Sequence, residues 1–274
     1  MNIRYSADGQ AMPPKTQKIT KAAFQKIDKT EIRWLSSAGV MINTRGTILM
    51  IDPLLEGFDM PLLVDMPILP KDILHIDAML ITHIDNDHFS IPTCQDVKDI
   101  CYSYHAPKYV ASVMRENDIP GTGHTIHETF KINDIHITLT PAWHNWQNEK
   151  AKYQYREWKM EDYCGYWIET LDGTIWMPGD SRLLEEHLHM PQPDMILFDF
   201  ADDQWHITLE GAIQLANTYP KADLLCIHWG CVKSDMAVFN GNPKVLYDKI
   251  INPERIKVLA PGEPITLLKK EKVK

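Results

Sequence analysis

Six consecutive residues, "HIDNDH" at positions 83–88, contain four side chains that can bind a metal ion. They are His83, Asp85, Asp87 and His88, and they follow directly on the apolar run "DAMLIT" (77–82). Histidine nitrogens and carboxylate oxygens are donors that divalent first-row metals accept in proteins. The stretch is therefore either a metal-binding loop at the end of a strand or an acidic turn that contains two histidines.

Three more candidate ligands follow apolar, strand-like segments further along the chain. "ITLTPAW" runs into His144, "TIWMPG" runs into Asp180, and "LLCI" runs into His228. A buried strand holds its last residue rigidly, so side chains at several strand ends can converge on one rim. Each residue alone is more often structural, and Asp180 could simply cap a turn or a helix. Their occurrence together, in this order, favours a metal site.

The spacing within the first cluster predicts two adjacent metal positions. His83 and Asp85 lie two residues apart in an extended turn and can serve one ion. Asp87 and His88 follow at the expected start of a helix and point towards a second ion, with Asp180 able to bridge both. Two ions ~3.5–4 Å apart would lower the pKa of a bound water enough to supply a bridging hydroxide near neutral pH.

The elements that position these residues follow from apolar periodicity and turn signals. Expected strands lie at 31–53 (two or three strands), 77–82, 134–140, 163–177 (a hairpin that turns at Asp172–Gly173), 194–200 and 222–229. Helical or mixed segments are expected at 91–103 and 109–117, and helices at 208–220, capped by Thr208, and at 242–251. Strands come first and then alternate with helices, which predicts an α/β fold of packed sheets with helices outside.

Length and composition favour one soluble enzyme-sized domain. No repeat or linker divides the 274 residues, so we expect a lead-in at 1–30 and a single domain at 31–274. The net charge of −9 disfavours nucleic acid as a partner. No apolar stretch approaches the ~20 residues of a membrane span, and the N-terminus lacks the apolar region of a signal peptide. The five scattered cysteines are expected to be reduced thiols, so we predict a cytoplasmic protein. We also predict a small-molecule substrate and no membrane partner, and the chain could form a homo-oligomer.

Taken together, these motifs resemble the signature of the metallo-β-lactamase superfamily. That signature is H-x-H-x-D-H followed by a distant His, an Asp in a "GD" turn and a final His. "HIDNDH", His144 in "TPAWHNW", Asp180 in "MPGDSR" and His228 in "CIHWG" stand at those places in order. The resemblance covers roughly residues 31–260 and implies a four-layer αβ/βα sandwich with two divalent ions. It also implies that Asp52 in "ILMIDP" supports a ligand histidine.

One residue departs from the signature, because Asp85 stands where the family has its second histidine. The resemblance implies one ion held by His83, Asp85 and His144, another held by Asp87, His88 and His228, and Asp180 between them. An added carboxylate shifts preference from Zn towards Mn or Fe. The alternative is that Asp85 is no ligand and that the first position is weak or empty.

The segments "TPAWHNW", "DYCGYWIETLDGTIWMPGDSRL" and "DDQWHITLEGA" resemble the branch that holds the L-ascorbate-6-phosphate lactonases. That branch is also similar to the N-acylphosphatidylethanolamine-type phospholipase D enzymes. The resemblance implies a hydrolase that uses a metal-bridging hydroxide on a small, anionic, lactone-like ester. The alternatives are a phosphodiesterase of the phospholipase D-like branch and a catalytically weakened homologue that binds a ligand.

Further roles attach to residues near the proposed ligands. Asp87 could orient the hydroxide or pass a proton, and His206 could stabilise an oxyanion or hold a phosphate or carboxylate. Ser181 and Arg182 could contact an anionic group. The alternatives are a capping or packing role for His206 and a surface role for Arg182. Five tryptophans lie near these residues and could line a pocket or belong to the core: Trp143, Trp146, Trp176, Trp205 and Trp229.

Overall fold

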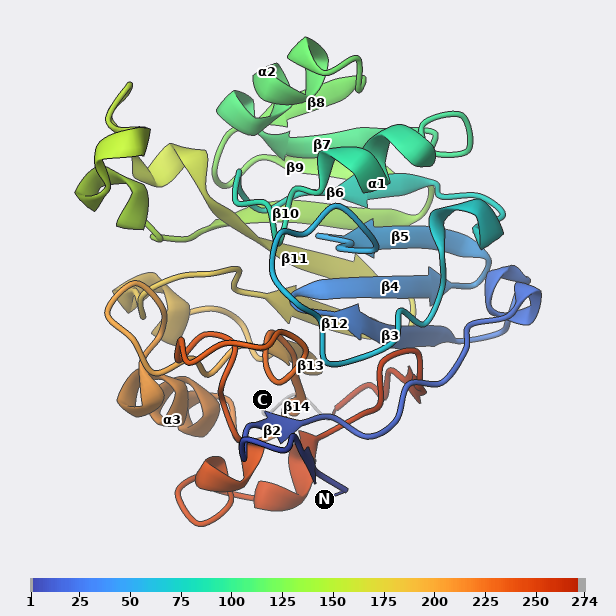
Figure 1. Cartoon of the computed structure of the whole chain (residues 1–274). Helices are drawn as coiled ribbons and strands as arrows, with labels where there is room; N and C mark the ends of the chain where they lie inside the picture. Colours follow the sequence, from blue (N-terminus) through green and yellow to red (C-terminus); the bar gives the residue numbers. More distant parts are fainter. Residues whose placement is uncertain (1, 271–274) are drawn as a thin grey trace.

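Two seven-stranded sheets lie face to face in the computed structural model, which describes residues 2–270 (Figure 1). The first sheet has the order β16 (Pro264–Thr266), β3 (Thr30–Ser36), β4 (Gly39–Thr44), β5 (Thr47–Ile51), β6 (Ala78–Leu80), β7 (Tyr104–Pro107) and β8 (Gly121–His124). The second has the order β15 (Ile256–Lys257), β14 (Asp223–Cys226), β13 (Met195–Phe198), β12 (Gly173–Met177), β11 (Cys164–Thr170), β10 (Ile135–Pro141) and β9 (Thr129–Ile132). A separate pair joins β1 (Arg4–Tyr5) to β2 (Ala11–Met12).

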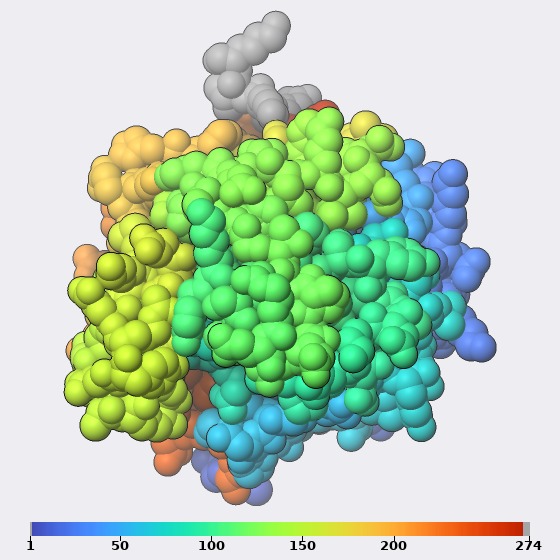
Figure 2. Space-filling model, turned by 90° about the horizontal axis from the view of Figure 1, so that it is seen from above, coloured from blue at the N-terminus to red at the C-terminus, as the bar shows by residue number. Residues whose placement is uncertain are grey.

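Helices cover the outer faces of both sheets (Figure 1). The α-helices are α1 (Ile91–Asp96), α2 (Lys108–Glu116) and α3 (Leu209–Thr218). Short 3-10 helices are η1 (Lys21–Phe24), η2 (Pro70–Asp72), η3 (Trp146–Glu149), η4 (Ala151–Tyr153), η5 (Met160–Asp162), η6 (Glu185–Leu188), η7 (Pro243–Leu246) and η8 (Pro253–Arg255). The expected αβ/βα sandwich is confirmed. Seen from above, the green residues of about 105–140 make up much of the visible surface (Figure 2).

Alternation along the strands builds two apolar layers. In β4, Val40 and Ile42 face the second sheet, whereas Met41 faces the layer under α1 and α2. Successive side chains of a strand point to opposite faces, so a strand buried on both sides is apolar throughout. The tightly packed sheets give the strand ends a rigid base. Among residues 2–270, no helix is both long and apolar enough to cross a bilayer.

Two expected helical features differ in the structure. The segment 242–251 forms only η7, because Val245, Tyr247 and Ile251 stay exposed and leave no continuous apolar face to bury. Asp87 and His88 do not begin a helix. They lie in a turn, and α1 starts at Ile91, where the hydroxyl of Ser90 accepts a hydrogen bond from the backbone N–H of Thr93.

Residues 2–30 pack onto the sandwich. They contain β1, β2 and η1, and Phe24 is buried in the layer under α1 and α2. Thr208 caps α3 as expected, since its hydroxyl accepts a hydrogen bond from the backbone N–H of Gly211. All five cysteines are free and buried.

Candidate metal centre

Six strands running in one direction end at the same rim of the sandwich. They are β5, β6, β10, β12, β13 and β14, which lead into Asp52, His83, His144, Asp180, Asp199 and His228 respectively. The backbone turns sharply at two of these ends, where Asp52 and His228 have φ values of +43° and +59°. Left-handed backbone at a non-glycine residue costs energy and is found at functional sites. The turns aim both side chains along the rim.

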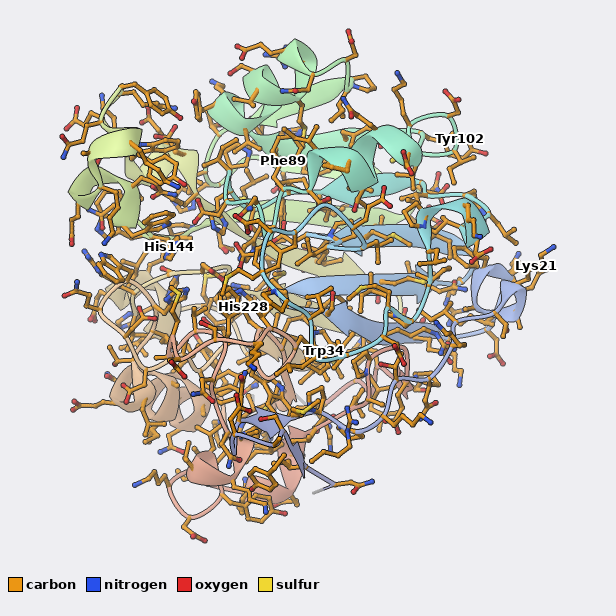
Figure 3. The ribbon with its side chains drawn as sticks, in the orientation of Figure 1. Lys21, Trp34, Phe89, Tyr102, His144 and His228 are labelled. Atoms are coloured by element: carbon orange, nitrogen blue, oxygen red, sulfur yellow. The ribbon has the colours of Figure 1, made fainter. Side chains whose placement is uncertain are left out.

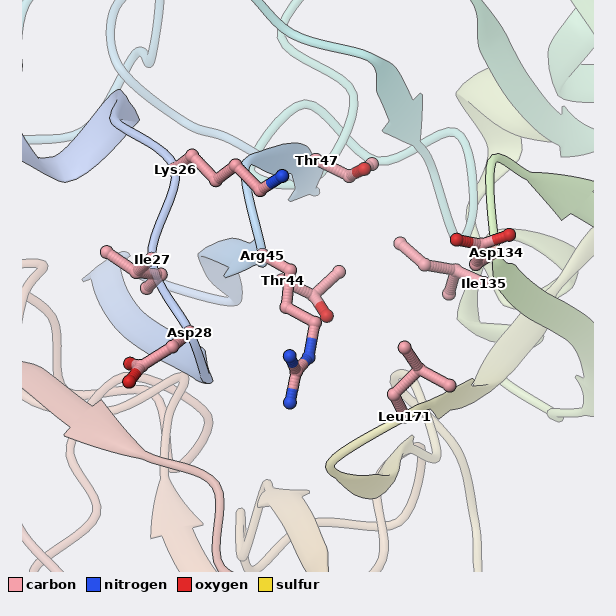
Figure 4. Close-up of a pocket in the computed structure, with 9 residues that line it drawn as sticks. All are labelled: Lys26, Ile27, Asp28, Thr44, Arg45, Thr47, Asp134, Ile135 and Leu171. Atoms are coloured by element: carbon pink, nitrogen blue, oxygen red, sulfur yellow. The ribbon is translucent and has the colours of Figure 1, made fainter.

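This rim lies at one end of the molecule. His144 and His228 sit on the side away from Lys21 and Tyr102 (Figure 3). A cavity of about 560 Å³ opens at the opposite strand ends, between the β4–β5 turn and the β11–β12 turn (Figure 4). There, Arg45 forms an ion pair of 2.6 Å with Asp172, and the lining residues include no histidine. The candidate metal ligands therefore lie at the rim and not in this cavity.

His83, Asp85 and His144 form one group of potential ligands. The Nε2 atoms of His83 and His144 lie 3.2 and 3.3 Å from Oδ2 of Asp85. One donor atom of each residue lies within 4.8 Å of the others, a separation that one ion can span. The structure therefore brings together the three residues predicted for the first position, and their binding of an ion stays a prediction.

Two side chains that the sequence did not connect with Asp85 hold its carboxylate. Trp146 donates its indole N–H to Oδ2 at 2.6 Å, and Gln147 donates its amide N–H to Oδ1 at 2.6 Å. Gln147 is fully buried and accepts a hydrogen bond from the hydroxyl of Tyr163. The two donors fix the carboxylate plane and leave the opposite side of Oδ2 facing the histidines.

Asp87, His88 and His228 form the second group. Nε2 of His228 lies 3.1 Å from Oδ2 of Asp87, and Nε2 of His88 lies 3.7 Å from the same oxygen. Asp180 lies between the groups, with Oδ2 at 3.1 Å from Nε2 of His88. His83, His88 and Asp180 also satisfy the same distance criterion as one ligand set. Asp180 thus lies near ligand candidates of both groups, and its bridging role stays a prediction.

Three of the four signature histidines are tethered through the ring nitrogen that faces away from the centre. Nδ1 of His88 lies 2.8 Å from Oδ2 of Asp52, as expected for a supporting carboxylate. Nδ1 of His83 lies 3.0 Å from the hydroxyl of Thr82, and Nδ1 of His144 lies 3.0 Å from the carbonyl oxygen of Trp205. Such tethers fix the ring orientation and the tautomer of metal-binding histidines.

The remaining donor atoms fit a metal. Among residues 2–270, buried atoms without a hydrogen-bond partner include Nε2 of His83, Nε2 of His88, Nδ1 of His228 and Oδ2 of Asp199. Buried polar atoms normally have partners, and four such atoms on one rim need an explanation. A set of imidazole nitrogens and carboxylate oxygens is what divalent first-row metals bind.

Strong electrostatic coupling accompanies this geometry. Burial alone would raise the pKa of Asp180, but the imidazoles of His228, His88 and His206 hold it well below its usual range. Burial opposes charge on His88, yet the carboxylates of Asp180, Asp87 and Asp52 raise its pKa well above the usual value. Carboxylates that favour a charged imidazole would equally favour a metal cation in its place, and binding of such a cation would release protons.

His206 lies inside the cluster and faces Asp180. Its Nε2 is 3.1 Å from Oδ2 of Asp180, and its Nδ1 is 2.8 Å from both oxygens of Asp203. Its side chain is only 6% exposed. The ring therefore points into the ligand group and not towards an open substrate surface.

Ser181 and Arg182 are engaged in the rim structure. The hydroxyl of Ser181 accepts a hydrogen bond from the N–H of Trp143 and donates one to the carbonyl oxygen of Arg182. Arg182 donates its Nε–H to the carbonyl oxygen of Gln204. These bonds support the loop that carries Asp180, and a substrate contact by either residue stays a prediction.

The tryptophans divide between core and rim. Trp176 and Trp229 are 0% and 2% exposed within the apolar layer between the sheets, so they do not line a pocket. Their position is a consequence of strand burial, which sequence proximity to a ligand does not reveal. Trp143, Trp146 and Trp205 are partly exposed near the centre.

Comparison with known proteins agrees with this site. The family model of the beta-lactamase superfamily domain matches residues 47–229, which include every ligand candidate of the predicted signature. The chain belongs to the metallo-β-lactamase superfamily.

Several known proteins resemble the chain along most of its length. A UPF0173 metal-dependent hydrolase of Archaeoglobus fulgidus is 23% identical over 244 residues, 85% of this chain and 97% of the relative. The structure of Igni18, a metallo hydrolase from Ignicoccus hospitalis, has a TM-score of 0.69 at 17% identity and covers 88% of this chain and 100% of that one. An isothiocyanate hydrolase from Delia radicum gut bacteria has a TM-score of 0.68 at 19% identity, covering 86% and 98%. At these identities the solved structures establish a common fold.

Proposed function

We propose that the chain is a hydrolase that depends on two divalent ions, with Mn, Zn and Fe as the candidates. The observation that carries the proposal is the convergence of buried imidazoles and carboxylates on one rim, with donor atoms that lack other partners. The proposed ligands are His83, Asp85, Asp87, His88, His144, Asp180 and His228. Membership of the superfamily and the hydrolase names of its similar members support the same reading.

Divalent ions bound there would polarise a substrate oxygen and lower the pKa of a bound water to near neutrality. Asp87 is the chain's own candidate for moving a proton. Its side chain is 13% exposed at the rim, and its Oδ2 lies 3.1 Å from Nε2 of His228. Asp180 and Asp52 orient the imidazole of His88 from its two sides.

A small, anionic, lactone-like ester is the proposed substrate. Cationic side chains near the rim support the anionic part: Lys150 lies over the ring of Trp205, and Lys152 lies over the ring of Tyr153. Tyr153 in turn contacts Trp146, which holds Asp85. These cations would attract an anionic group towards a centre whose own carboxylates would be partly neutralised by bound metal.

A phosphodiester with an apolar substituent is the second candidate. Phe239 lies 5.7 Å from the ring of His228 and packs with Phe58 and Met60, which are partly buried. This apolar group beside the second ligand set could hold an acyl chain or a ring. This apolar group supports the phosphodiesterase alternative. The alternative of a catalytically weakened homologue is less favoured, because two hydrogen bonds hold Asp85 in place.

The proposal is tested by hydrolysis assays on full-length protein reconstituted separately with Mn²⁺, Zn²⁺ and Fe²⁺. A phosphorylated sugar lactone, an unphosphorylated lactone and bis(p-nitrophenyl) phosphate distinguish the candidates. We expect turnover with at least one metal, and at least a hundredfold loss in Asp87→Asn. The control is Asp248→Asn, which changes an exposed carboxylate in the segment 242–251. Bound metal without turnover of any of the three substrates would contradict the hydrolase proposal.

A further inference from the structure

We propose that Asp180, Asp199, His206 and His228 form a third cation site, beside the two positions of the superfamily signature. One donor atom from each of these four residues lies within 4.8 Å of the others. That separation suits ligand atoms on opposite sides of one ion with bonds of ~2.0–2.2 Å. Asp199 and His206 lie outside the signature, and the site takes a divalent ion such as Mn²⁺.

His206 is held in the way that metal-binding histidines are held. Its Nδ1 contacts the carboxylate of Asp203 at 2.8 Å, and its Nε2 points into the cluster. His88 has the same arrangement, with Asp52 at 2.8 Å from its Nδ1. A carboxylate behind the ring fixes the tautomer and makes Nε2 a better donor to a metal. His206 is therefore prepared as a ligand to the same degree as a histidine of the signature.

Two atoms of the cluster lack partners. Oδ1 of Asp199 accepts a hydrogen bond from the N–H of Ala201 at 3.0 Å. Its buried Oδ2 and Nδ1 of His228 have no hydrogen-bond partner among residues 2–270, and the His228 side chain is 1% exposed. A carboxylate oxygen and an imidazole nitrogen left without partners in one buried group are both explained by a bound cation.

The charge balance favours three ions. Six carboxylates lie within or directly behind the ligand groups: Asp52, Asp85, Asp87, Asp180, Asp199 and Asp203. With neutral imidazoles, two divalent ions leave two negative charges, which is costly in a buried site. A third divalent ion bound at Nδ1 of His228, whose Nε2 serves the second group, would displace the remaining proton of that ring, so three ions leave one negative charge. This argument rests on the proposed metal centre and on no particular substrate.

The experiment counts metal in full-length protein that has been stripped with chelator and equilibrated with Mn²⁺. Asp199→Asn keeps the size of the side chain and the Oδ1 acceptor for Ala201, so the loop retains its hydrogen bond. Asp202→Asn is the matched control, since it makes the same change at an exposed carboxylate three residues away. Plasma mass spectrometry should find three Mn per chain in the wild type and in Asp202→Asn, and two in Asp199→Asn.

Equal counts in the wild type and Asp199→Asn would overturn the third site. Two Mn per chain in both proteins would leave the proposed function intact. No Mn in either protein would contradict both the third site and the proposed function. A second variant keeps the test independent of Asp199: Asp203→Asn removes the charge behind His206. We expect the weakest of the three Mn²⁺ dissociation constants to rise about 10–100-fold in calorimetric titration. An unchanged constant would contradict the assignment of His206 as a ligand.

Discussion

At the scale of single residues, the surroundings of Asp85 are built for a carboxylate. Trp146 and Gln147 donate hydrogen bonds to different oxygens of the same group. One imidazole cannot accept both bonds and also present a nitrogen to a metal. This geometry supports the proposal that Asp85 is a ligand over the alternative that the first position is weak or empty. As a ligand, its oxygen would favour Mn or Fe in the first position over Zn.

Restoring the family histidine should accordingly weaken the centre. In Asp85→His, the buried Gln147 amide loses its acceptor, at a cost of about 1–3 kcal/mol. We expect lower thermal stability and at least tenfold weaker Mn²⁺ binding at one position, measured by calorimetric titration. Binding that equals or exceeds the wild type would show that the two donors do not select a carboxylate.

Removing the hydrogen bond from Gln147 to Asp85 should also weaken Mn²⁺ binding. Gln147→Ala takes away one of the two donors, and loss of a residue that orients a ligand costs about 10–100-fold in metal affinity. Gln154→Ala is the control, because Gln154 is exposed in the same segment and bonds only the carbonyl oxygen of Asn148. Equal Mn²⁺ affinity in both variants would contradict a positioning role for Gln147.

At the scale of elements, strand ends were predictable and side-chain directions were not. Apolar runs before His83, His144, Asp180 and His228 are visible in the sequence, and each does end at the rim. Nothing in "FDFADD" distinguishes Asp199 from Asp202, because only the turn after β13 decides which carboxylate points inward.

The two residues that hold Asp85 could not be predicted from the sequence, for a related reason. Its partners lie 61 and 62 positions away, and they meet it only because η3 folds over the rim beside β6. Contacts of that range depend on how segments pack and leave no periodic signal. The superfamily signature therefore identifies ligands far better than it identifies the residues that hold them.

A histidine pair on β7 and β8 gives the fold a measurable pH dependence. Burial and the neighbouring His124 lower the pKa of His105 to about 4. Between pH 6.5 and 4 the unfolded chain binds a proton that the folded chain does not, so stability falls as the pH falls through this window. The loss is at most about 3 kcal/mol.

The dependence should be flatter in His105→Phe, which keeps a ring against Phe130 and cannot take up a proton. Urea unfolding at several pH values measures the free energy of unfolding of both proteins. The contributions of other titrating groups cancel in the difference between the two curves. His127→Gln, at an exposed histidine, should follow the wild type. Parallel curves for His105→Phe and wild type would contradict the assignment.

At the scale of the whole molecule, the metal centre joins the two sheets. His83 to His88 follow β6 of the first sheet, whereas His144, Asp180 and His228 follow strands of the second. Bound ions therefore stabilise the native sandwich against any opening between its sheets. Ions bind the folded chain only, because the unfolded chain brings no such set together.

Chelation should consequently lower the melting temperature. An ion at a hundred times its Kd stabilises by ~2.7 kcal/mol, which corresponds to roughly 5–10 °C for a chain of this size. Differential scanning fluorimetry with and without EDTA measures the shift. The double variant His83→Ala, His228→Ala should melt at one temperature in both buffers. An equal EDTA effect in wild type and variant would place the stabilising ions elsewhere.

The division of ligands between the sheets also has a consequence for biosynthesis. Asp87 and His228, which face each other at 3.1 Å, are separated by 141 positions. At ~5–20 residues per second, the ribosome needs roughly 7–28 s to add that stretch. For this interval the second ligand group lacks His228, although the first group is complete once residue 144 has been added. An ion that needs both Asp87 and His228 would therefore bind only after residue 228 has been made.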